Sequence, residues 1–241
     1  VSPHALFFSQ STEAPLLAST EKIIAERYGE FQKHGFEQTE QKRDALRTKL
    51  GRGIPIDISY DSVMDVRFPL RSEEPGLTLR LIHSPGHTAG HSVVEVPELS
   101  VLIIADALLS GGVPDTEGNL VLPPTNRFID DYVQTIEKLK KKDAEWILPT
   151  HFHAIRGGEA WQTFCKESLA FVEKVDEFIL NVLSDIPSAG LLDFVEAAAK
   201  RPLGGWPETM NQELTYCLLG GLERLERKKR VEQHRLMWKL A

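Results

Sequence analysis

The residues best suited to chemistry are three histidines in the stretch LRLIHSPGHTAGHSVVEV, residues 79–96, namely His83, His87 and His91. A spacing of four residues would place all three on one face of an α-helix, as in metal-binding helices. Pro85, Gly86 and Gly90 lie among them, however, and these residue types oppose a continuous helix. The stretch instead predicts a strand, a tight turn and a second strand, with the histidines carried largely by the loop.

Two further polar residues end short apolar runs elsewhere in the chain. Asp106 follows VLIIA and His151 follows WILPT, and each run is typical of a buried strand. A histidine alone is more often structural than metal-binding, and an aspartate after a strand is often a helix cap. Neutral imidazoles combined with a carboxylate that can bridge two ions are, however, the donors of a hydrolytic metal centre. Together, His87, Asp106 and His151 therefore predict a metal site.

The elements that must position these residues are strands and helices in mixed order. Strands are predicted at residues 66–70, 78–83, 92–96, 101–105 and around 146–149, and helices around 127–142 and 159–183. Near the start, SPHALFF and APLLAST predict a short helix followed by a short buried strand. Ser19 begins a charged helical stretch that ends before the glycines and proline of LGRGIP. This order predicts a layered α/β fold.

The pattern changes near Ser184, which divides the chain into residues 1–183 and a small unit of residues 184–241. The tail predicts two helices and a short strand, and a unit of this size is expected to dock on the main domain. Its charge run ERLERKKR, residues 223–230, could suggest nucleic-acid contact. Because acids alternate with the bases, the run is better interpreted as the solvated face of a helix.

Composition excludes several classes of protein. Of 241 residues, 41% are hydrophobic and 26% charged, as in ordinary globular proteins, and the formal net charge is −7. This acidity argues against nucleic acid as a partner. The chain has two distant cysteines and no long apolar run, which favours a reducing, cytoplasmic location without a membrane partner. The sequence is also compatible with a homo-oligomer.

The segments SPGHTAGH, IIAD and LPTHF resemble the second half of the metallo-β-lactamase superfamily. The resemblance implies a four-layer αβ/βα sandwich in which His87 binds the first metal, Asp106 bridges both metals and His151 binds the second. The chain departs from the family pattern at Ala105, where glycine is usual, and on both sides of His151. By the same resemblance, His91 orients the loop beside the ligands. His153 is expected either at the mouth of the site, beside the ligands, or on a solvated loop.

The family's hallmark, His-x-His-x-Asp-His, does not occur in the chain. The residues after Val1 resemble the segment that follows this hallmark, so the fold is expected to be incomplete at its N-terminal side. A complete site is implied to hold two zinc ions, with iron or manganese as alternatives. With one histidine and the shared carboxylate per ion, residues 1–241 alone are predicted to bind zinc weakly or not at all.

The resemblance implies hydrolysis of a small-molecule thioester, ester or lactone by metal-activated hydroxide. The order of elements in residues 184–241 also resembles the winged-helix-like accessory unit of the β-lactamase-like protein 2 group, which favours a nuclease as the alternative. A third possibility is a degenerate protein that keeps the fold as a binding module. Gly112–Phe128 and a helical insert at Tyr28–Leu50 are expected to wall the pocket.

Overall fold

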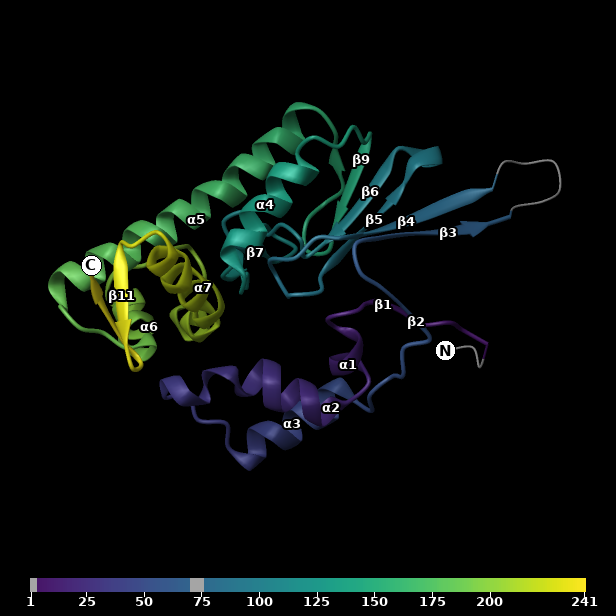
Figure 1. Cartoon of the computed structure of the whole chain (residues 1–241). Helices are drawn as coiled ribbons and strands as arrows, with labels where there is room; N and C mark the ends of the chain where they lie inside the picture. Colours follow the sequence, from purple (N-terminus) through teal and green to yellow (C-terminus); the bar gives the residue numbers. More distant parts are fainter. Residues whose placement is uncertain (1–3, 70–75) are drawn as a thin grey trace.

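The structure is a computed structural model that describes residues 4–69 and 76–241. Its centre is a six-stranded sheet in the order β10-β9-β6-β5-β4-β3 (Figure 1). The strands are β3 (Val63–Phe68), β4 (Leu77–His83), β5 (Ser92–Val96), β6 (Val101–Ala105), β9 (Trp146–Pro149) and β10 (Ile155–Arg156). Only the β6–β9 pair is parallel among these neighbours. The strands predicted for β3, β4, β5, β6 and β9 are confirmed, with β3 beginning earlier than expected; Leu70, its predicted end, lies outside the described residues.

Two helices cover one face of this sheet, α4 (Ile129–Leu139) and α5 (Glu159–Asp185) (Figure 1). On that face Leu102, Ile104 and Ile147 are fully buried and share a hydrophobic cluster with residues of both helices. The expected inner stripe of α4, Tyr132, Ile136 and Leu139, is also fully buried. Apolar residues at helical spacing thus fix which side of each helix meets the sheet.

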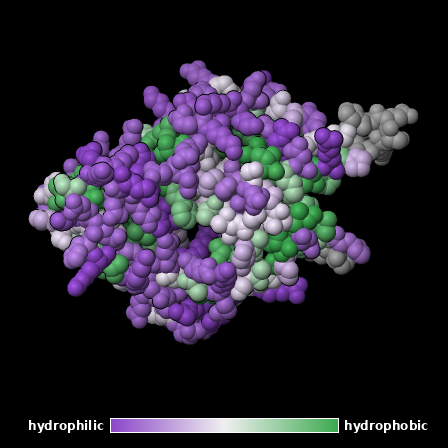
Figure 2. Space-filling view, in the orientation of Figure 1, coloured by the Kyte–Doolittle hydropathy of each residue, from purple (hydrophilic) through white to green (hydrophobic). Residues whose placement is uncertain are grey.

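The opposite face of the sheet is apolar but only partly covered. One row runs across five strands through successive pairs, from Met64 through Leu81, Val94 and Ile103 to Leu148. These side chains are partly exposed, and Ile103 remains 38% exposed. A sheet with one solvated face normally carries polar residues there. The composition therefore matches a sheet covered on both faces, as in the four-layer sandwich, and Figure 2 shows hydrophobic residues gathered on the strand side of the molecule.

The N-terminal segment lies below this sheet (Figure 1) and contains the one clear reversal of the predicted order. Strand β1 (Phe8–Gln10) comes first and α1 (Ala14–Leu17) second, so the predicted helix-then-strand order is wrong. The reason is tertiary: β1 pairs in parallel with the distant β2 (Ile58–Tyr60). The APLL residues instead form one helical turn, with Pro15 in the first turn, where proline is tolerated.

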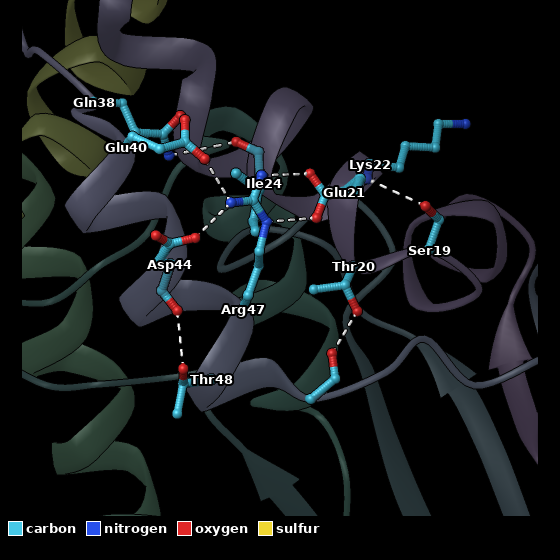
Figure 3. A network of polar contacts seen from close by, with 11 residues as sticks. Ser19, Thr20, Glu21, Lys22, Ile24, Gln38, Glu40, Asp44, Arg47 and Thr48 are labelled. Carbon is cyan, nitrogen blue, oxygen red and sulfur yellow. Dashed lines mark hydrogen bonds and ion pairs between the residues drawn. The ribbon is translucent and has the colours of Figure 1, made fainter.

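Helix α2 (Thr20–Lys22) continues as a π-helical segment (Ile23–Tyr28) and a 3-10 segment (Gly29–His34), and α3 (Glu40–Leu50) returns antiparallel to them. As predicted, Ser19 caps the start, its Oγ accepting a hydrogen bond from Lys22 N. Arg47 of α3 donates bidentately to Glu21 at 2.8 and 3.1 Å and also contacts Glu40 (Figure 3). This network holds the pKa of Glu21 below its usual range and fixes α3 against α2.

The C-terminal segment packs against α5 and α4. It comprises α6 (Leu191–Lys200), a 3-10 segment (Glu208–Glu213), α7 (Leu214–Arg227), β11 (Val231–His234) and β12 (Met237–Leu240). The two helices and hairpin follow the predicted order, with one more strand than expected. One hydrophobic cluster extends from Phe31 through the sheet to Trp238, and α5 continues past residue 183 to Asp185.

The charge run at residues 223–230 is only partly solvated. Residues 226–230 are exposed, but Glu223 and Arg224 turn inward and form ion pairs with Arg127 and Asp176. The interpretation as a wholly solvated face is therefore wrong at these two positions, because Arg127, just before α4, and Asp176 of α5 supply charges of opposite sign. In the described residues, no helix combines the length and apolarity that crossing a bilayer requires.

Candidate functional site

The loop that carries His87 is held by main-chain hydrogen bonds on both sides. Ser84 N donates to His91 O at 2.7 Å, and Phe128 N donates to Gly86 O at 2.8 Å, which ties the loop to the start of α4. Thr135 of α4 donates to Pro85 O at 2.7 Å. These contacts, made by the residues next to β4 and β5 and by α4 with its N-cap residue, hold the loop that carries His87 in place.

Asp106 and His151 come from neighbouring parallel strands. Ala105, the last residue of β6, pairs with Pro149, the last residue of β9, so the residues that follow both strands emerge at the same sheet edge. Ala105 has a φ of +45°. This left-handed conformation is one that glycine adopts without cost, which gives a physical reason for the glycine usual in the family. The turn it makes delivers Asp106 toward the histidine loop.

The three predicted ligands meet at this edge. His87 Nε2 lies 3.9 Å from Asp106 Oδ2, and His151 Nε2 lies 3.4 Å from Asp106 Oδ1. The carboxylate therefore lies between the two imidazoles, with one oxygen toward each. Asp106 Oδ1 is buried and has no hydrogen-bond partner among the described residues. Burying such an oxygen without a partner is unfavourable, so this arrangement fits a carboxylate that serves as a ligand.

The distances test the fit further. Two donors about 2.1 Å from one tetrahedral ion lie roughly 3.4 Å from each other. The His151–Asp106 pair matches this spacing, and the His87–Asp106 pair at 3.9 Å is slightly long. In residues 4–69 and 76–241, however, no three His, Cys, Asp or Glu side chains form a group that could hold one ion. The described residues thus fit each metal position only as a pair of donors.

The protonation of His87 suits metal binding. Burial lowers its pKa to about 4, and the neighbouring His91 adds to the effect while Asp106 opposes it. The imidazole is therefore neutral at pH 7, the form that binds metal ions. Its Nδ1 lies 3.4 Å from the Thr125 hydroxyl, a long hydrogen bond that orients the ring.

The two other predicted histidines take different positions. His91 packs edge-on against His87, with ring centroids 5.8 Å apart, and burial lowers its pKa. His153 is exposed and lines an open hollow together with His151 and the β7–β8 hairpin (Val113–Pro114 and Leu120–Leu122). His83, at the end of β4, contacts Ala89 O at 2.8 Å through Nε2. The roles predicted for His91 and His153 stay predictions.

Neither cysteine takes part in this cluster. Cys165 and Cys217 are free and buried in the hydrophobic core, and burial raises the pKa of each thiol to about 12. A metal-binding cysteine must be deprotonated, so these thiols are poor ligands at neutral pH.

A cavity of about 230 Å³ lies on the His87 side of the cluster. Most of its wall was not predicted from the sequence. Only Glu30 comes from the expected insert at Tyr28–Leu50; Leu16, Arg27 and Tyr216 come from elements on either side of it, and Arg127 and Phe128 come from the expected Gly112–Phe128 segment. The surface is hollowed between the N-terminal segment and the body above it (Figure 2). No local motif marks Arg27 or Tyr216, because only tertiary packing brings them to His87.

The charged wall of the cavity is held by one buried arginine. Arg127 donates to Glu30 of the N-terminal segment at 2.6 Å and to Glu223 of α7 at 2.8 Å. Its side chain is only 9% exposed. Glu13 also links two segments, because its Oε1 accepts a hydrogen bond from Gly90 N at 3.0 Å. The cavity is thus built where three distant parts of the chain join.

Comparisons with solved structures agree with the overall fold. A beta-lactamase domain protein from Burkholderia ambifaria aligns over 98% of this chain and 65% of its own, with a TM-score of 0.66 and 15% identity. A metallo-beta-lactamase family protein from Thermus thermophilus aligns over 98% of this chain and 72% of its own, with a TM-score of 0.70 and 18% identity. These two likenesses show the fold.

The match to a family model gives the family. The chain is 32% identical over 104 residues to the Beta-lactamase-like protein 2 homolog of Caenorhabditis elegans, a match that spans 43% of this chain and 28% of that protein. The model of the metallo-beta-lactamase superfamily matches residues 18–151, more than half of the chain, and this range contains His87, Asp106 and His151. The chain therefore belongs to the metallo-β-lactamase superfamily.

Proposed function

We propose that this chain supplies part of the active site of a metal-dependent hydrolase that cleaves a small-molecule thioester, ester or lactone. The observation that carries the proposal is the position of Asp106 between His87 and His151, with a buried carboxylate oxygen that accepts no hydrogen bond from the described residues. In this proposal His87 and His151 each hold one metal ion, zinc or alternatively iron or manganese, and Asp106 binds both.

Bound metal ions of this kind lower the pKa of water, so that hydroxide is available near neutral pH, and polarise a carbonyl oxygen. The residues of this chain provide the setting for that chemistry. Thr125 orients the His87 ring, and the buried contacts of the histidine loop keep it in place. Leu16, Phe128 and Tyr216 line the adjacent cavity, where they can exclude water from an acyl group.

Donor counting sets a condition on this proposal. Each ion would receive one imidazole and one carboxylate oxygen from the described residues, whereas a catalytic zinc site uses three protein ligands. Further donors are therefore required for tight binding. The 241-residue chain is expected to lose zinc on dialysis against buffer, and retention of stoichiometric zinc by this chain would contradict the donor count.

The test of function is hydrolysis of a generic thioester, followed by the thiol released, with the full product of the open reading frame that contains this sequence. An Asp106→Ala variant is expected to lose activity at least about a hundredfold. The matched control is Asp131→Ala, which removes an exposed carboxylate in the first turn of α4. Equal rates for the parent and Asp106→Ala would overturn the metal-centre assignment. Cleavage of RNA without thioester turnover would favour the nuclease alternative.

A further inference from the structure

The cavity beside His87 contains one charged side chain that has no partner among residues 4–69 and 76–241. Three acids line the cavity, and each is engaged elsewhere. Glu13 accepts a hydrogen bond from Gly90 N, Glu26 lies 3.8 Å from Lys22, and Glu30 binds Arg127 at 2.6 Å. Of the charged side chains that line the cavity, Arg27 alone makes no hydrogen bond or ion pair with the described residues.

Arg27 is placed by a well-supported piece of backbone. It lies on the π-helical segment Ile23–Tyr28, in which Ile24 is 1% exposed and anchors the segment inside. The preceding turn is fixed by the Glu21–Arg47 contact (Figure 3). Arg27 itself is partly buried and lines the same cavity as His87. Its cationic group therefore belongs to the cavity wall beside the candidate metal centre.

The rest of the wall is apolar. Leu16, Phe128 and Tyr216 line the same cavity as Arg27 and His87. Its volume of about 230 Å³ lies below the roughly 300–1,000 Å³ of pockets for drug-sized ligands, which favours a small substrate. A planar guanidinium with free donors is suited to bidentate binding of a carboxylate. An apolar wall beside it suits a short hydrocarbon chain.

We propose that Arg27 anchors a carboxylate on the substrate, whose short apolar part lies against Leu16, Phe128 and Tyr216 while its scissile bond faces His87. The inference rests on the proposed hydrolase function, which it narrows to carboxylate-bearing acyl substrates. The negative charges of the three acids around the cavity would attract a cationic ligand. An amine is therefore the ligand that competes with a carboxylate in this proposal. Because the three carboxylates already contact Gly90, Lys22 and Arg127, the guanidinium of Arg27 is the charged group that remains available to a ligand.

Binding can be measured without catalysis. The 241-residue chain is titrated with octanoate, octan-1-ol and octylamine, and binding is followed by NMR through the backbone amides of Thr88 and Ala89, which line the cavity. These amides separate the cavity from the apolar sheet face, where hydrocarbon chains can also bind. Octanoate is expected to bind at least about tenfold more tightly than octan-1-ol, the size expected for hydrogen bonds to a charged group. Equal or tighter binding of octylamine overturns the proposal.

Variants assign the effect to one residue. Arg27→Gln is expected to weaken octanoate binding by about ten- to a hundredfold and to leave octan-1-ol binding within about twofold. Arg27→Lys keeps the charge without the bidentate geometry and should restore part of the affinity. The control is Arg52→Gln, an equal change of charge at an exposed residue outside the cavity. An unchanged affinity for octanoate in a folded Arg27→Gln variant contradicts the proposal.

A kinetic measurement separates this inference from the proposed function. With the full open-reading-frame product, Arg27→Gln should raise KM for a carboxylate-bearing ester at least about tenfold more than it raises KM for the matched neutral ester. Absence of hydrolysis with any ester, together with Arg27-dependent octanoate binding, would refute the hydrolase and keep the anion site. Hydrolysis with equal effects on both esters would keep the hydrolase and refute the role of Arg27.

Discussion

Gly86 lies so close to Tyr132 that a Cβ added to the glycine would be 2.6 Å from the Tyr132 Cα. Gly86 also has a φ of +145°, a region that residues with side chains rarely adopt. The residue before His87 therefore packs directly on the backbone of α4, and Phe128 N donates to its carbonyl. This contact links the position of the candidate ligand to the position of the helix.

Because of this close approach, Gly86 should not tolerate a side chain. Gly86→Ala should lower the free energy of unfolding by about 2–5 kcal/mol, because backbone strain adds to overlap with a rigid neighbour. The matched control is Gly118→Ala, where φ is +90° but nothing lies within 4 Å of the added Cβ. Gly118→Ala should lower the free energy of unfolding by only about 1–2 kcal/mol. Urea denaturation measures both, and equal losses would show that the contact with Tyr132 contributes nothing.

Ala105 provides a prediction of opposite sign. Its φ of +45° is unfavourable for alanine and costs glycine nothing, so Ala105→Gly should stabilise the fold by about 0.5–1 kcal/mol after the larger chain entropy of glycine is counted. Ala170→Gly, at an exposed position inside α5, should instead destabilise it by about 1 kcal/mol. The midpoints of chemical denaturation compare the two variants. A loss of stability in Ala105→Gly would show that the backbone of Ala105 is not strained.

We expect the ion pairs of Arg127 to contribute most of the electrostatic stabilisation between the N-terminal segment and α7. Arg127→Ala leaves Glu30 and Glu223 without the cation that they share, and should destabilise the protein by about 3–5 kcal/mol. Arg156, 76% exposed and 3.6 Å from Glu145, is the control, and Arg156→Ala should cost less than about 1 kcal/mol. If thermal or urea unfolding gives a similar loss of stability for the two variants, the ion pairs of Arg127 do not join the segments.

His34 predicts how stability responds to acid. The ring is buried, stacks on Trp238 at 5.6 Å between centroids, and has no hydrogen-bond partner for either nitrogen among the described residues. Desolvation lowers its pKa, with Lys33 and Arg127 adding to the effect and Glu30 and Glu223 opposing it. The unfolded state therefore binds the proton more readily, and stability should fall as pH drops below about 6.5, the ordinary histidine pKa.

The measurement is urea denaturation at a series of pH values between neutral and mildly acidic. His34→Phe removes the titrating group and keeps an aromatic ring against Trp238, so its stability should depend less on pH than that of the parent chain. His153→Phe, at an exposed position, is the control and should retain the parent's dependence. Identical pH profiles for His34→Phe and the parent would exclude the buried histidine as a cause.

Much of the fold was predictable from local pattern. The strands that carry the candidate ligands, and the helices that cover them, follow from apolar runs and helical spacing, because these residues bury the same faces that their periodicity marks. Asp106 and His151 were recognisable because each follows such a run. The start of the chain was mispredicted because β1 depends on pairing with the distant β2, which no local pattern encodes.

The sequence by itself determined which residues could bind metal, because their types and the glycine and proline around them are local properties. Only the tertiary structure decided how they meet: parallel pairing of β6 with β9 brings Asp106 to His151, and packing of the histidine loop on α4 brings His87 to Asp106. It also decided that Arg27 and Tyr216, far apart in the chain, share one cavity wall. The reason is physical, since distances across a packed interior depend on which surfaces bury each other.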